Sequence, residues 1–460
     1  MPSRDAGEST RPGLACRTEA SIVESLPTGF VWGVSTSSFQ IEGAAHEGGR
    51  GASVWDTYCE EGRVANRETA EVACDHYHRY LEDVGLIRQL GVQAYRFSIA
   101  WPRIVPLGRG APNEAGLDFY DRLIDAILAA DIEPWLCLYH WDLPQALDDL
   151  GGWTNRDCAG WFADYAALVA ARYGSRVKRF ATFNEPSIFT LFGLGFGGKR
   201  ATADSVTLHA AIHHINLAHG AAVRALRAHV TGASIGAIHN YQPCLPLSPA
   251  DLDATAVCDA YWNRAYPDPQ CLGCYPEGMR TAIEPHLQAQ DLSNIAAPLD
   301  WFGINHYSPV FVKTDPTAML GFTSGQAPPG VPLTPNGWPI MPACFRDALE
   351  RAANRYRLPI YVMENGFGGF DELDENAQVT DVKRIDYLRA YIAAMNAAAH
   401  AAADVRGYFV WSLLDNFEWD AGYGVRFGLA YVDYPTQRRI PKASFHWYRN
   451  LINLARKRSA

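Results

Sequence analysis

The sequence predicts an α/β fold: a single-domain (β/α)8 barrel, or TIM barrel, with extended βα loops. Eight short apolar or β-branched segments alternate with longer helical patterns, and regular repetition of this unit favours a closed parallel barrel over an open sheet. The length of 460 residues agrees, because such barrels commonly exceed about 250 residues when their loops are long. The expected strands lie at residues 30–44, 94–104, 133–144, 179–186, 233–241, 300–309, 358–366 and 406–416.

Helical patterns fill the intervals between these segments. The clearest lie at residues 114–130, 155–173, 206–228, 343–356 and 381–402, and each is long enough to cover the outside of a barrel. We expect the barrel domain to span residues 26–460. Residues 1–25 are polar and contain Pro2, Gly7, Pro12 and Gly13, which predicts a disordered or loosely attached N-terminal extension.

The composition argues against several classes of function. The net charge of −10 would repel a phosphate backbone, so we expect no nucleic-acid partner. No apolar run reaches the roughly 18 residues that cross a bilayer, and residues 1–25 lack the apolar run of a signal peptide. We therefore expect no membrane association and a cytoplasmic location. The 13 tryptophans fit either a tryptophan-rich core or a surface that packs against sugar rings, and composition leaves both open.

Cysteine and histidine spacings give weak signals for metal binding. The ten cysteines are interpreted as reduced thiols. Cys271 and Cys274 form a C-x-x-C pair, but the second pair that a structural zinc site needs is missing. His209 and His213 stand four residues apart without the glutamate of an H-E-x-x-H motif, which favours ordinary helix residues. We expect neither a metal nor an organic cofactor.

Polar and aromatic side chains gather where several expected strands end. Examples are 139–142 (YHWD), 184–186 (NEP), 305–307 (NHY) and 364–366 (ENG). In (β/α)8 barrels the catalytic side chains lie at the carboxyl ends of the strands, so this repeated position favours one shared active site. Two of these residues, Glu185 and Glu364, could flank a glycosidic bond as acid and nucleophile. A single glutamate at a strand end is more often structural or ligand-binding.

Four motifs stand in order along the chain: 30–44 (FVWGVSTSSFQIEGA), 182–186 (TFNEP), 362–366 (VMENG) and 416–419 (NFEW). Together they resemble glycoside hydrolase family 1, and the resemblance extends from about residue 26 to residue 448. It implies a retaining β-glycosidase, in the first place a β-glucosidase that removes terminal non-reducing β-D-glucosyl residues from a β-glucoside or oligosaccharide. β-Galactosyl and β-fucosyl residues are further candidate substrates, and the oligomeric state stays open.

The resemblance also assigns roles to individual residues. Glu185 would be the general acid/base and Glu364 the nucleophile. Arg96, with Asn305 and Tyr307, would support the nucleophile, and its charge favours ionised Glu364, which in turn keeps Glu185 protonated. The residues implied in substrate binding are Gln40, His140, Trp141, Asn184, Trp411, Glu418, Trp419 and Phe427.

The sequence departs from the family pattern at two positions and leaves two rival functions. Met363 stands where the family commonly has threonine, and His306 where an aromatic residue is common. Because side chains alternate along a strand, we expect Met363 to point away from the substrate. A 6-phospho-β-glycosidase is disfavoured because Glu418 would repel a phosphate. A non-catalytic sugar-binding barrel is disfavoured because both catalytic glutamates are present.

Overall fold

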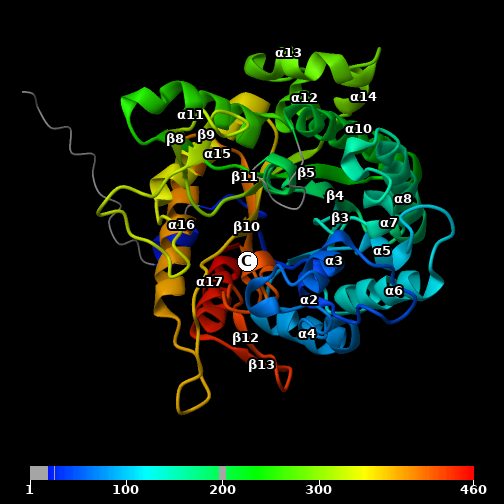
Figure 1. Cartoon of the computed structure of the whole chain (residues 1–460). Helices are drawn as coiled ribbons and strands as arrows, with labels where there is room; N and C mark the ends of the chain where they lie inside the picture. The colour runs from blue at the N-terminus through cyan, green and yellow to red at the C-terminus, as the bar shows by residue number, and fades with distance from the viewer. Residues whose placement is uncertain (1–18, 25, 196–203, 460) are drawn as a thin grey trace, which may run out of the picture.

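The computed structural model describes residues 19–24, 26–195 and 204–459. Eight parallel strands close into a barrel in the order β1-β11-β10-β7-β5-β4-β3-β2 (Figure 1), which confirms the predicted fold class. Each expected segment contributes one strand, and the first and last strands pair to close the barrel. The barrel strands are β1 (Val31–Ser35), β2 (Ala94–Ser98), β3 (Glu133–Tyr139), β4 (Arg179–Asn184), β5 (Ser234–Asn240), β7 (Trp301–Asn305), β10 (Ile360–Asn365) and β11 (Val405–Trp411).

Long helices form a layer around the barrel (Figure 1). In α6, Leu117, Tyr120, Leu123 and Ile127 are buried, and their spacing of three or four residues gives the helix one apolar face toward the strands. The five expected helices are present with small shifts at their ends. The long helices are α4 (His76–Leu90), α6 (Glu114–Ala129), α8 (Cys158–Tyr173), α10 (Ser205–His229), α15 (Pro342–Tyr356), α16 (Val382–His400) and α17 (Ala443–Ser459).

Short elements in the loops build the rim above the barrel. The strands are β6 (Cys244–Pro246), β8 (Val310–Thr314) and β9 (Phe322–Ser324) in one small sheet and β12 (Ala430–Asp433) with β13 (Arg438–Pro441) in another. The helices are α2 (Ser38–Ile41), α3 (Val54–Glu60), α5 (Trp101–Ile104), α7 (Gln145–Asp148), α9 (Pro186–Thr190), α11 (Leu252–Asp259), α12 (Pro267–Leu272), α13 (Arg280–Ile283) and α14 (Asp291–Ile295), with the π-helical turn η5 (Ala260–Arg264).

The expected strands extend past the ends of the observed strands, and the first two do so most. Strand β1 ends at Ser35 and helix α2 follows, while α5 follows β2. The apolar residues there are buried for a different reason: Trp101 stacks on Tyr165 with ring centroids 5.0 Å apart, so it packs against a neighbouring helix. Pro102 lies in the first turn of α5, where proline favours helix initiation.

A packed core fills the lower part of the barrel. Trp135, Trp301, Tyr361 and Phe409 are among its largest members. Glycines make room for these rings, because a Cβ atom at Gly33 would lie 2.2 Å from the Phe409 ring. The barrel is therefore a filled core, and space for a ligand remains only above it, at the carboxyl ends of the strands.

Part of the predicted N-terminal extension is attached to the barrel. Residues 19–24 form α1 (Glu19–Glu24), in which Ile22 is buried. The Glu19 carboxylate accepts hydrogen bonds from Arg389 and Trp447, each 3.0 Å long. This stretch differs from the predicted loose attachment, and residues 1–18 and 25 lie outside the described residues. Within the described ranges, no helix combines the length and apolar character needed to cross a membrane.

Candidate active site

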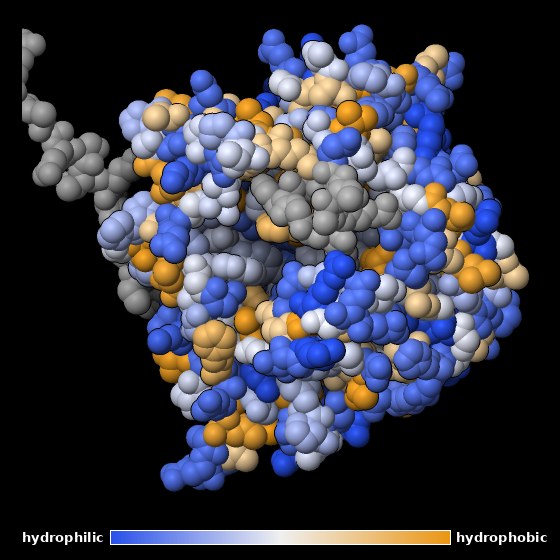
Figure 2. Space-filling view, in the orientation of Figure 1, coloured by the Kyte–Doolittle hydropathy of each residue, from blue (hydrophilic) through white to orange (hydrophobic). Residues whose placement is uncertain are grey.

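A cavity of about 1280 Å³ opens at the carboxyl ends of the barrel strands. Figure 2 shows a hollow near the middle of this face of the molecule. Residues that line the cavity include Glu185 after β4, Glu364 in β10 and Trp411 in β11. The polar strand ends therefore meet in one place, as predicted. The volume exceeds the range of about 300–1,000 Å³ common for small-ligand pockets, which leaves room beyond a single sugar ring.

Glu364 is the carboxyl that has a cation in direct contact. Arg96 is fully buried and forms an ion pair with Glu364 Oε1. The Tyr307 hydroxyl donates a hydrogen bond of 2.7 Å to Glu364 Oε2. Burial raises the pKa of Glu364, whereas Arg96, Tyr307 and Asn305 lower it. Because a guanidinium is in direct contact with Glu364 and no described residue forms an ion pair with Glu185, the ionised form is favoured more at Glu364 than at Glu185.

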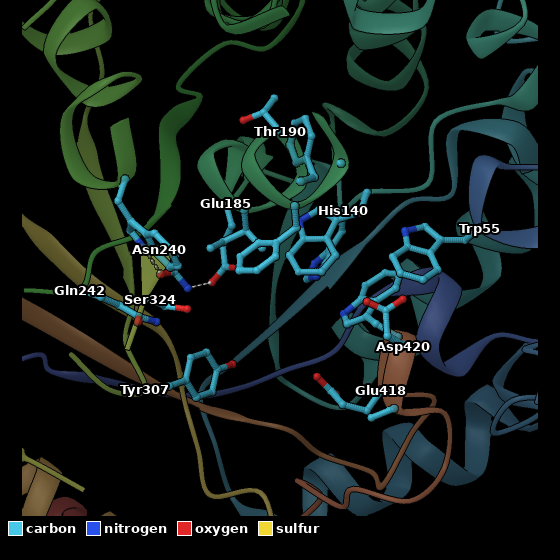
Figure 3. Close-up of a pocket in the computed structure, with 18 of the residues that line it drawn as sticks. Trp55, His140, Glu185, Thr190, Asn240, Gln242, Tyr307, Ser324, Glu418 and Asp420 are labelled. Carbon is cyan, nitrogen blue, oxygen red and sulfur yellow. Dashed lines mark hydrogen bonds between the residues drawn. The ribbon is translucent and has the colours of Figure 1, made fainter. Parts of the chain in front are cut away.

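Glu185 occupies a different electrostatic environment. It follows β4 with a left-handed backbone (φ 51°) at the start of α9. Its Oε1 accepts a hydrogen bond from Asn240 Nδ2 at 2.9 Å (Figure 3) and another from Asn305 Nδ2 at 2.8 Å. Burial, followed by the negative charge of Glu364, raises the pKa of Glu185 to about 8. Burial and the charge of Glu364 thus favour the protonated form of Glu185, whereas Arg96 favours the ionised form of Glu364; the assignment of acid and nucleophile stays a prediction.

Asn305 links the two carboxyls. Its Nδ2 donates to Glu185 Oε1 and, at 3.0 Å, to Asn184 Oδ1, and the same side chain interacts with Glu364. One amide group thus bonds one carboxyl and lowers the pKa of the other, and both carboxyls line the same cavity. A retaining glycosidase needs two carboxyl groups in one cavity, about 5 to 5.5 Å apart.

Aromatic rings form one wall of the cavity. The His140 ring lies 5.7 Å from the Trp411 ring and 5.9 Å from the Trp419 ring, both nearly parallel, and the Trp141 ring lies 4.6 Å from that of Trp419. On another side, Phe427 packs 6.0 Å from Tyr307. Such flat apolar surfaces suit the apolar face of a pyranose ring.

Glu418 supplies a third carboxyl to the same space. Figure 3 shows Glu185, Tyr307 and Glu418 around this space from different sides. Burial is the largest cause that raises the pKa of Glu418, followed by the charges of Glu364 and Glu185. Hydrogen bonds from Gln40 and Trp411 oppose this, and the resulting pKa is about 8. A buried carboxyl of this kind is a strong acceptor for sugar hydroxyls once it is ionised.

Gln40 and Asn184 are predicted to touch the substrate, but they lie behind the residues that line the cavity. Gln40 Nε2 donates to Phe417 O at 3.0 Å and to Glu418 Oε2 at 3.3 Å. Asn184 Oδ1 accepts from Arg96 at 2.6 Å and from Asn305 at 3.0 Å. Both amides therefore hold side chains of the cavity in place, and their contact with sugar stays a prediction.

Two departures from the family pattern have structural explanations. Met363 lies with Tyr361 in the barrel core, and a register shift between Val362 and Glu364 interrupts the alternation of β10. Met363 does not line the cavity, in keeping with the expectation that it points away from the substrate, but alternation is not the reason. Met363 lies in the barrel core and Glu364 lines the cavity above it, so the two differ in depth. His306 is buried outside the cavity, where its ring stacks on Phe345 at 4.9 Å.

The remaining histidine and cysteine candidates have ordinary partners. His213 Nε2 lies 2.8 Å from Asp291 Oδ2, and His209 Nε2 lies 2.6 Å from the Tyr261 hydroxyl. Cys271 and Cys274 are free thiols. Across the part of the chain that the structure describes, no three His, Cys, Asp or Glu side chains cluster as metal ligands would.

The structure adds residues that sequence reasoning missed. They come from loops above the barrel and from the end of β5, and they include Trp55, Tyr58, Asn240, Gln242, Trp262, Ser324, Trp338 and Asp420. Asn240 had a usable signal, because it is a polar residue at the end of an expected strand. The others lie in loops whose paths depend on tertiary contacts.

Comparison with known proteins settles the family. The family model described as "Glycosyl hydrolase family 1" matches residues 22–457. The chain belongs to glycosyl hydrolase family 1. It is 42% identical to β-glucosidase A of Thermotoga maritima over 442 residues, covering 94% of this chain and 98% of that protein. It is also 42% identical to a β-glucosidase of an Agrobacterium species, covering 93% of this chain and 95% of that protein.

Solved structures agree with these relatives. The β-glucosidase of Thermotoga maritima in complex with deoxynojirimycin superposes with a TM-score of 0.88 at 41% identity, covering 94% of this chain and 99% of that chain. The family 1 chain described here is thus a glycoside hydrolase, and enzymes of this family are retaining glycosidases.

Proposed function

We propose that this family 1 enzyme removes terminal non-reducing β-D-glucosyl residues by double displacement, with Glu364 as nucleophile and Glu185 as general acid/base. The observation that supports it best is the contrast between two buried carboxyls of one cavity. Glu364 is paired with Arg96, whereas Glu185 has a pKa of about 8. A retaining glycosidase needs this combination, because one carboxyl must attack and the other must give a proton.

In the first step, an oxygen of the Glu364 carboxylate attacks the anomeric carbon from the α face. The bond to the leaving oxygen breaks, and Glu185 transfers its proton to that oxygen, so the aglycone leaves as a neutral alcohol. The sugar is now an α-ester of Glu364, which has lost its negative charge. The charge of Glu364 no longer raises the pKa of Glu185, so Glu185 releases its proton more easily.

In the second step, Glu185 acts as a base. Its carboxylate takes a proton from a water molecule, whose oxygen attacks the anomeric carbon and displaces Glu364. Two inversions give net retention, and both glutamates return to their starting protonation states. Tyr307 and Arg96, which contact the oxygens of Glu364, stabilise the carboxylate as it departs.

The proposed sugar is glucose, because the curated relatives cited above are β-glucosidases. A relative from Bifidobacterium breve, 41% identical, is a bifunctional β-D-glucosidase/β-D-fucosidase, so β-fucosides belong in any substrate panel. Glu418 argues against a 6-phosphosugar, because an anionic phosphate would meet the Glu418 carboxyl in a cavity that also holds Glu185 and Glu364. The aromatic wall of Trp411 and Trp419 would pack against the sugar ring.

Azide rescue of two variants tests the assignment. Glu364→Ala should lose turnover of aryl β-glucosides, and azide should restore it with α-glucosyl azide as the product, since azide fills the space of the nucleophile. Glu185→Ala should keep activity only on substrates with good leaving groups, and azide should then give β-glucosyl azide. Glu350→Ala, which removes a carboxylate paired with Arg346 on the surface, is the control and should behave as the parent enzyme.

The stereochemistry of the azide product decides between the roles. β-Glucosyl azide from Glu364→Ala, or full activity of that variant without azide, would contradict the proposal. Proton NMR of the product distinguishes the two anomers by the coupling constant of the anomeric proton.

A further inference from the structure

A buried amide connects Trp262 to the carboxyl of Glu185. The Trp262 indole N–H donates a hydrogen bond of 2.9 Å to Asn240 Oδ1. Asn240 Nδ2 donates in turn to Glu185 Oε1, also at 2.9 Å, and Figure 3 shows these two side chains pointing toward one another. Asn240 is the last residue of β5 and is only 4% exposed. Trp262 lies in the π-helical turn η5, so the chain of contacts joins a loop to the barrel.

The indole decides which way the Asn240 amide faces. An indole N–H can only donate, whereas an asparagine amide can donate from nitrogen and accept at oxygen. The carbonyl of Asn240 must therefore face Trp262, and its NH₂ must face Glu185. A flipped amide would place two donors against each other at Trp262, which is unfavourable in a buried site.

This orientation determines which Glu185 oxygen can hold the proton. Oε1 already accepts from Asn240 and, at 2.8 Å, from Asn305. No described residue makes a hydrogen bond to Oε2. A proton on Oε1 would compete with two N–H donors, so the neutral carboxyl carries its proton on Oε2. With a flipped Asn240, a proton on Oε1 could instead bond the amide carbonyl and be held away from the substrate.

We infer that Trp262 is a positioning residue that acts through Asn240 to keep the acidic proton of Glu185 on Oε2, where the leaving-group oxygen can take it. The inference rests on the proposed acid/base role of Glu185. Trp262 also lines the cavity, and its ring meets that of Phe192 edge to face at 5.9 Å. The same indole therefore borders the space for the substrate and orients the acid.

Trp262→Phe tests this, because it keeps an aromatic ring and removes the indole N–H together with the five-membered ring that carries it. The readout is kcat/KM for aryl β-glucosides that range from 2,4-dinitrophenyl, which leaves without a proton, to 4-methoxyphenyl, which needs one. We expect a loss of about tenfold or more for 4-methoxyphenyl and of less than about twofold for 2,4-dinitrophenyl, because only the former depends on general acid catalysis.

The pH profile gives a second readout. The hydrogen bond from Asn240 lowers the pKa of Glu185, so loss of its orientation should move the basic limb of kcat/KM to higher pH. Glu364, Arg96, Glu418 and Tyr307 are the other titratable or charged groups that interact with Glu185, and the substitution leaves all four in place.

Two further variants separate a positioning role from a structural one. Trp447→Phe also removes an indole N–H bond to a glutamate, 3.0 Å from Glu19, but lies on α17 away from the cavity, so its profile should match the parent. Asn240→Ala should reproduce the leaving-group dependence. Adding Trp262→Phe to Asn240→Ala should then change little, because residues that act through one another are non-additive.

Three results would overturn the inference. They are an equal loss for every leaving group, additive effects of Trp262→Phe and Asn240→Ala, or a basic limb that does not move. Glu185→Ala distinguishes this failure from failure of the proposed function. One outcome is that Glu185→Ala loses more kcat/KM on the 4-methoxyphenyl glucoside than on the 2,4-dinitrophenyl glucoside, while Trp262→Phe and Asn240→Ala show no such difference. In that case only the role of Trp262 is wrong. If Glu185→Ala shows no such selectivity, the acid/base assignment itself fails.

Discussion

Glu364→Gln should lower the pKa of Glu185, and the size of the effect can be worked out. Two unit charges about 5.5 Å apart, at an effective dielectric constant of about 20, interact by roughly 3 kcal/mol. This energy corresponds to roughly two pH units in a pKa. The neutral glutamine removes the charge of Glu364 that raises the pKa of Glu185. The pKa should therefore fall from about 8 to roughly 6, with burial still holding it above the ordinary value.

The assay is a carbon-13 NMR titration of enzyme labelled at the glutamate side-chain carboxyl carbons. The Glu185 resonance is assigned by its loss in Glu185→Gln. Parent enzyme trapped with a 2-deoxy-2-fluoroglucosyl group on Glu364 should give the same low pKa as Glu364→Gln, because esterification removes the same charge. In the parent, kcat/KM for substrates that need an acid should fall as the pH rises through about 8, where Glu185 loses its proton.

An unchanged Glu185 pKa in both forms would refute this reasoning. It would mean that burial alone sets the value, and that loss of the Glu364 charge does not convert Glu185 from acid to base.

Three other perturbations should have distinct effects. Arg96→Met removes the guanidinium that lowers the pKa of Glu364; the acid limb of kcat/KM should move to higher pH and neutral-pH activity should fall by about 10²- to 10³-fold. Glu418→Gln should reduce kcat/KM for an aryl β-glucoside by about tenfold, the loss expected when one or two buried hydrogen bonds to sugar hydroxyls are removed, whereas unchanged kinetics would place the sugar elsewhere. Lys442→Met leaves Asp371 and Asp415 without a donor that lies 2.6 Å from each and should lower the free energy of unfolding by about 3–5 kcal/mol, measured by urea denaturation.

The barrel was predictable because its signal is local and repeated. Each strand consists of a few apolar residues, and α6 shows its buried face through the spacing of Leu117, Tyr120 and Ile127. These periodicities follow from backbone geometry and need no knowledge of distant contacts. The meeting of Glu185 and Glu364 in one cavity was predictable for a related reason: both lie at strand ends, and in a parallel barrel all carboxyl ends of strands meet at one face.

The ends of the strands were not predictable to the same degree. In residues 36–44, Phe39 and Ile41 alternate with polar residues as in a strand, but both are buried above the barrel, Phe39 against the rings of Phe417 and Trp419. Hydropathy reports burial without saying what covers a residue, so the helix α2 was missed. Alternation did not explain the position of Met363, because a register shift in β10 interrupts an alternation that holds only in regular strands.

The sequence by itself determined the eight-fold alternation, the family and the two carboxyls, because each depends on residues close together in the chain. Only the tertiary structure decided the pKa values of these carboxyls and the position of the acidic proton. The pKa of Glu185 depends on burial and on Glu364, and the direction of its proton depends on Asn240 and Trp262. Electrostatic and hydrogen-bond energies act through space, so they become visible only when the barrel brings distant strand ends within a few ångströms of one another.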